Sequence, residues 1–184
     1  MGPAGPVDEA ALQRIEQEFE VSLPDEYRAF LLKFGDGLIG PGIMRTVREG
    51  LSLASKRAFP LSNPVLGSGA FSFQKLSIEE QEGELEALFR VWDAIPKEDG
   101  VLRLCDYGGG IYGVLILNGP YRGRVWMLQA DTGYYGPFGG SEPLHDESVT
   151  ISWNPSDHPR DYSFLEWYES WLNGRLKMAG VMPL

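Results

Sequence analysis

The chain has 184 residues, 43% of them hydrophobic and 23% charged, which is typical of one globular domain with a substantial core. Its net charge of −10 argues against binding nucleic acid and favours a basic protein partner. The single cysteine excludes an internal disulfide, and no apolar run is long enough to span a membrane. Because the start also lacks the features of a signal peptide, we expect a cytoplasmic protein.

Two helices are predicted after a flexible lead at residues 1–7. Asp8 can cap the first helix, which runs to about Glu20 with apolar residues at near-helical spacing. Pro24 suits the first turn of the second helix, where two acidic residues lie near the positive end of the helix dipole. Gly35-Asp36-Gly37 ends this second helix.

Residues 38–75 are predicted to be an irregular insertion, because glycine and proline interrupt any regular pattern. We expect loops and one short strand near Gly42–Val47. The segment is locally basic, with five lysines and arginines against one glutamate. A long insertion of this kind is usually a surface excursion or a functional loop.

A third helix is predicted from the capping box that begins at Ser77, and Pro96 stops it. The polar face of this helix is acidic, and the glutamates singled out on it are Glu79, Glu82 and Glu86. Two interpretations stay open for this face: a solvated helix surface, and a docking surface for a basic partner.

The most strand-like part of the chain runs from Val101 to Ala130. It holds three apolar runs, at residues 101–105, 111–117 and 124–130, and the middle run is apolar enough to be buried on both faces. The turn after the first run contains three consecutive glycines, and Asn118-Gly119 begins a hairpin loop after the second. These signals predict a three-stranded antiparallel meander.

Two further features follow the meander. Tyr134 and Tyr135 lie between glycines, and they either pack on the sheet or serve as exposed interface anchors. Ser163 opens a capping box for a last helix, and residues 178–184 are expected to be a loose tail. The fold class predicted for residues 1–184 is a single α+β domain, in which N-terminal and C-terminal helices pack on an antiparallel β-meander sheet.

The sequence offers no clustered acid, base and nucleophile. Cys105 stands at a strand end, where a buried thiol acting as a small hydrophobe is favoured over a nucleophile. Neither His145 nor His158 has the spacing of a metal ligand. We therefore expect no catalytic residue, no metal and no cofactor.

Three short signals resemble the SUKH superfamily, which includes fungal cell-wall-assembly regulators and many bacterial immunity proteins. They are the opening helix with its Leu23-Pro24 step, the Asp106-Tyr107-Gly turn before an apolar strand, and the closing Ser163-Phe-x-x-Trp-Tyr. The resemblance covers roughly residues 9–172. Gly109 departs from it, since many relatives have cysteine in this turn.

The resemblance implies a binding protein, because bacterial members typically neutralise toxins that are encoded beside them. Our leading hypothesis is a non-enzymatic immunity protein that blocks a toxin domain by direct contact, helped by electrostatic steering. The contact candidates are Asp106, Tyr107, Tyr134, Tyr135, Glu79, Glu82 and Glu86. The alternative is a regulatory scaffold that docks a cellular protein or peptide in a groove beside the sheet.

Overall fold

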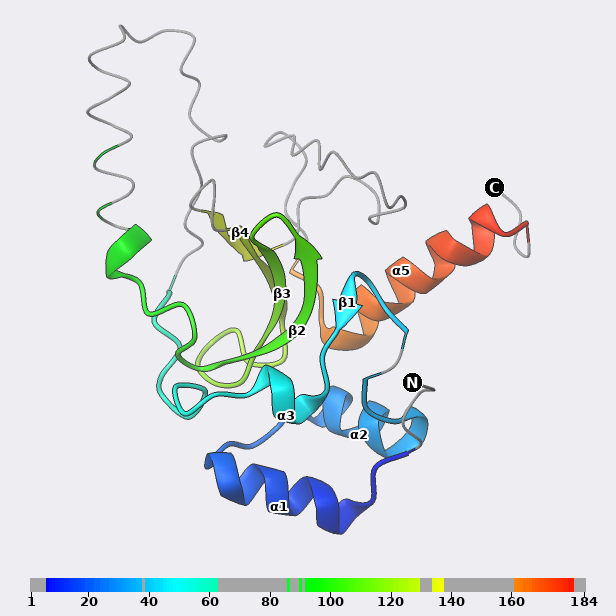
Figure 1. Ribbon diagram of the computed structural model, residues 1–184, viewed down its shortest axis with the longest axis horizontal. Coiled ribbons are helices and arrows are strands. Elements are labelled where there is room, and N and C mark those ends of the chain that lie inside the picture. The colour runs from blue at the N-terminus through cyan, green and yellow to red at the C-terminus, as the bar shows by residue number, and fades with distance from the viewer. Residues whose placement is uncertain are drawn as a thin grey trace, which may run out of the picture.

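The computed structural model describes residues 6–37, 39–62, 86, 90, 92–129, 134–137 and 161–180. The helices are α1 (Glu9–Phe19), α2 (Asp25–Phe34), α3 (Val47–Gly50) and α5 (Phe164–Met178). The strands are β1 (Ile43–Met44), β2 (Val101–Gly108), β3 (Ile111–Ile116), β4 (Val125–Gln129) and β5 (Tyr134–Pro137). They form one antiparallel sheet in the order β1-β2-β3-β4-β5, with α5 on one side and residues 92–100 on the other (Figure 1). The predicted α+β fold is confirmed.

The two N-terminal helices begin and end close to their predicted limits. The backbone N–H of Ala11 donates to the Asp8 carboxylate at 2.6 Å, which caps α1. Pro24 occupies the position before α2 and not its first turn, and Gly35, with a φ of 112°, follows the last residue of α2. Arg28 of α2 pairs with Glu9 and Glu16 of α1, so charged side chains join the two helices.

The described part of the 38–75 segment is built into the domain. The predicted short strand is β1, which pairs with β2 at the edge of the sheet. Helix α3 was not predicted, although Thr46 and Glu49 form a capping box at its start that is readable as a T-x-x-E pattern. The basic side chains of this segment pair with acids elsewhere, as in Arg48–Glu18 at 2.7 Å and Lys56–Glu20 at 2.6 Å.

A β-bulge in β2 decides which side chains face which core. Arg103 pairs with Val114 and Cys105 pairs with Gly113, so β2 has one extra residue between them. Leu104 and Cys105 therefore both face the first core, while Asp106 returns to the face that Arg103 occupies.

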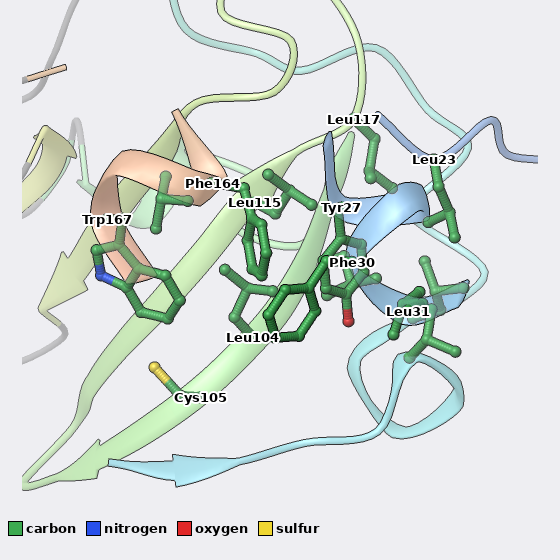
Figure 2. Packing of buried hydrophobic residues seen from close by; sticks show 14 of the residues in the cluster. Leu23, Tyr27, Phe30, Leu31, Leu104, Cys105, Leu115, Leu117, Phe164 and Trp167 are labelled. Carbon is green, nitrogen blue, oxygen red and sulfur yellow. The ribbon is translucent and has the colours of Figure 1, made fainter. Parts of the chain in front are cut away.

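The first core lies between the sheet and the helices. Leu104 and Leu115 of the sheet meet Phe30 of α2 and Phe164 of α5 (Figure 2). The Phe164 ring lies with its centroid 4.8 Å from that of Tyr27 and 5.0 Å from that of Phe30, in edge-to-face contacts. This aromatic cluster fixes α2 and α5 against one face of the sheet.

The second core covers the opposite face of the sheet. Its buried residues are Phe59, Trp92, Val101, Val114, Ile116, Trp126, Leu128 and Tyr135. Trp126 is fully buried, and its ring centroid lies 5.4 Å from that of Phe59. Strand β3 is therefore buried on both faces, as its sequence predicts.

Candidate partner-binding site

The last part of β2, just before its turn into β3, carries the first two predicted contact residues. The Asp106 carboxylate accepts a hydrogen bond from the backbone N–H of Gly108 at 2.8 Å and lies 3.9 Å from the Arg45 guanidinium. Its side chain is 30% exposed, so it remains available to a partner. Tyr107 instead turns its hydroxyl inward beside Cys105 and Trp167, and burial raises its pKa. Of these two neighbours, Asp106 therefore exposes its polar group to a partner, whereas Tyr107 buries its own.

Tyr134 and Tyr135 lie in β5, a strand that the sequence analysis did not predict. Tyr134 packs into the first core and Tyr135 into the second, with exposed fractions of 3% and 0%. Of the two interpretations that the sequence left open, packing on the sheet is the one observed, and exposed interface anchors are not. These side chains would reach a partner only if β5 moved.

The acidic helix face lies mostly outside the described residues. Glu79 and Glu82 are not among them, so their predicted roles stay predictions. Glu86 is exposed and pairs with Arg90 at 3.2 Å. Both interpretations of this face, solvated surface and docking surface, remain open.

Cys105 is fully buried in the first core, beside Gly113 and Tyr107. Burial raises the pKa of its thiol from 9.0 to about 12, so the reactive thiolate is disfavoured at neutral pH. Among the described residues, no group of three or more histidine, cysteine, aspartate or glutamate side chains has the geometry to hold a metal ion. Within the same ranges, no helix combines the length and hydropathy needed to cross a bilayer.

We expect the folded protein to resist alkylation at Cys105, so that iodoacetamide labels it at about pH 8 only as fast as the chain opens. Between pH 9 and about 12 an unfolded thiol loses its proton while the folded one keeps it. The unfolded state then binds fewer protons, so the free energy of unfolding falls as pH rises through this window. Cys105→Ala should make that slope shallower in denaturant titrations, and buried tyrosines such as Tyr135, whose pKa burial also raises, account for the part that remains. Labelling of the native protein as fast as of the denatured control would contradict the burial.

An acidic groove, absent from the sequence predictions, lies where α2 and α5 begin. It has a volume of about 680 Å³, and a second hollow of about 480 Å³ continues it along α5, sharing Glu166 and Glu169. The acidic side chains that line the two hollows are Asp25, Glu26, Asp161, Glu166 and Glu169. The groove joins segments more than 130 residues apart in sequence, so no local pattern could have predicted it.

The two arginines of this groove are already engaged. Arg122 donates to the backbone carbonyls of Ser22, Leu23 and Leu117, which ties the β3–β4 loop to the segment before α2. Arg124 lies 3.6 Å from the Asp161 carboxylate. Asp25 and Glu169 are exposed, and no ion pair to a described residue neutralises either of them, so the groove presents net negative charge.

The described residues thus define an α+β domain with a sheet covered on both faces, a buried cysteine, and an acidic surface groove. The chain belongs to the SMI1/KNR4 family (SUKH-1), whose family model matches residues 6–154. The predicted SUKH resemblance is confirmed. No curated protein and no solved structure shows a significant match to the chain.

Proposed function

We propose that this protein is a non-enzymatic immunity protein of the cytoplasm, which neutralises a cognate toxin domain by direct contact. The observation that best supports the proposal is the acidic groove at the start of α2 and α5. Asp25 and Glu169 leave their carboxylates exposed on its walls. A basic toxin domain would be steered to such a surface, and its active site would be covered on docking.

Two hydrogen bonds at the starts of α2 and α5 hold the walls of the groove together, which suits a rigid docking surface. The backbone N–H of Leu165 donates to the Glu26 carboxylate at 3.2 Å, linking the two helix starts. Glu166 accepts from the backbone N–H of Ser163 at 2.8 Å and completes a capping arrangement for α5. Because these two glutamates hold the helices in place, Asp25 and Glu169 are the better residues to change in a binding test.

The test is affinity capture from host extract, followed by identification of the captured protein and calorimetric titration with it. We expect a toxin domain whose activity this protein inhibits, with affinity that weakens as salt rises. Asp25→Asn with Glu169→Gln should weaken binding about tenfold at low salt. Glu86→Gln with Asp93→Asn removes the same charge from the predicted acidic helix that Pro96 stops. If only the second pair of substitutions weakened binding, docking would be assigned to the predicted acidic helix. Inhibition that does not depend on salt would contradict electrostatic steering.

A regulatory scaffold is the second candidate, and exposed apolar side chains at the edge of the sheet favour it. Ile43 of β1, the first strand in the described sheet order, is 75% exposed, and Ile39, four residues before it in the chain, is 78% exposed. An apolar peptide could dock there without electrostatic help. This function predicts a partner without toxin activity, binding that is indifferent to salt, and loss of binding in Ile43→Lys.

A further inference from the structure

A small cleft opens on the face of the sheet that carries the second core, beside Val101, Val114 and Leu128. Its volume is about 160 Å³. Val101, Val114 and Leu128 give it an apolar floor, and Arg45 and Arg103 stand among the charged residues of its rim. This cleft is separate from the acidic groove, since no residue lines both.

Strand pairing and the bulge in β2 bring the two arginines together. Met44 pairs with Cys105, and the backbone N–H of Arg45 donates to the Leu104 carbonyl at 2.8 Å. The bulge turns both Leu104 and Cys105 toward the first core, so Arg103 is left on the same face as the Arg45 side chain. If β2 alternated strictly through residues 103–105, Cys105 and its partner Met44 would lie on the face of Arg103, and Arg45 would lie on the opposite face.

Both guanidinium groups retain capacity to donate hydrogen bonds. The Nε of Arg45 is buried and has no hydrogen-bond partner among the described residues, and Asp106 lies 3.9 Å from another of its nitrogens. Arg103 stacks over the Tyr112 ring at 4.2 Å and lies 3.6 Å from the Glu98 carboxylate, beyond ordinary hydrogen-bond length. A buried N–H without a partner is costly, so an acceptor in the cleft would be stabilised.

The third cation of the cleft differs from the arginines. The Lys97 ammonium donates to the Trp92 carbonyl at 2.6 Å and lies 4.5 Å from the centroid of the Trp92 ring. It is therefore already engaged, as is Glu49, whose carboxylate closes the capping box of α3. Glu98 is the one acid of the rim that competes directly for Arg103.

We propose that this cleft binds a carboxylate on a short aliphatic stem, held by Arg45 and Arg103, with the stem on the apolar floor. The planar fork of a guanidinium matches a carboxylate. A cavity of about 150 Å³ takes a benzene-sized molecule, so the cleft has room for a short acid or an acidic side chain. The apolar floor favours such a ligand over inorganic phosphate, which has no stem to bury.

The test is an NMR titration of ¹⁵N-labelled protein with butyrate and with doubly capped glutamate. Saturable shifts are expected at the amides of residues 101–103, with butyramide giving none. Arg103→Met and Arg45→Met should each weaken binding about tenfold, because a hydrogen bond to a charged group is lost. Arg48→Met, which changes an arginine of the same segment that pairs with Glu18, should leave binding unchanged.

Glu98→Gln supplies a readout that impaired folding would not imitate, since removing the competing carboxylate should strengthen butyrate binding. Tighter binding of capped glutamate than of butyrate assigns the cleft to an acidic side chain of a protein partner, and the reverse assigns it to a free small acid. Equal shifts with butyramide, an unchanged affinity in Arg103→Met, or a stronger response to phosphate would each overturn the proposal.

Discussion

Replacement of Phe164 by alanine is expected to lower the free energy of unfolding by about 4 kcal/mol, the usual cost of deleting a buried phenyl ring. The side chain is fully buried at the start of α5. Its ring contacts Tyr27 and Phe30 of α2, and Trp167 lies 6.0 Å away on α5. Because the ring packs against α2, α5 and the sheet, the resulting cavity would border three elements that cannot all collapse into it.

Denaturant titration followed by tryptophan fluorescence measures this effect. Phe164→Leu should lose less than half as much stability as Phe164→Ala, because leucine keeps most of the buried volume. Leu165→Ala is the matched control, since its side chain is only partly buried on the next position of the same helix. A loss below about 1 kcal/mol in Phe164→Ala would show that α5 is not needed to close the first core.

Gly50→Ala is expected to cost about 3 kcal/mol, at the upper end of the range for overpacking. A Cβ atom at Gly50 would lie 2.3 Å from the Arg103 carbonyl oxygen and 3.1 Å from a methyl of Leu102. The first contact is with strand backbone, so α3 would have to move away from β2. Gly50 is not one of the described glycines with a positive φ, so backbone strain does not add to the effect. The clash alone accounts for the expected loss of stability.

Helix propensity predicts the opposite sign for this substitution. Gly50 is the last residue of α3, and alanine in a helix interior is favoured over glycine by about 1 kcal/mol. Thermal unfolding of Gly50→Ala therefore decides between propensity and packing. Arg48→Ala, on the exposed side of α3, should change stability by well under 1 kcal/mol. A stabilised Gly50→Ala variant would mean that α3 does not pack on β2 as described.

Much of the fold follows from local signals in the sequence. Asp8 caps α1 because a carboxylate before a helix can accept from the first backbone N–H groups. The three apolar runs of residues 101–130 become β2, β3 and β4 because glycine and Asn-Gly turns separate them. Two of the short signals behind the SUKH resemblance, Leu23-Pro24 and Asp106-Tyr107, lie within residues 6–154, which the family model matches, and the closing Ser163 motif lies after them. Each of these features depends on neighbours within a few residues.

Other features appeared only in the tertiary structure. The sequence did not show that Tyr134 and Tyr135 would form a strand beside β4, since glycines flank them and β4 supplies the pairing. It also did not show the bulge that sends Leu104 and Cys105 to one face, because a period-two pattern cannot locate an extra residue.

The candidate sites divide in the same way. The sequence by itself determined the acidic balance, the single cysteine and most of the strands and helices, because composition and periodicity are properties of short stretches. Only the tertiary structure decided that Asp25 and Glu169 line one groove and that Arg45 and Arg103 line one cleft. These pairs come from segments that are distant along the chain, and their approach depends on how the helices pack and how the strands register.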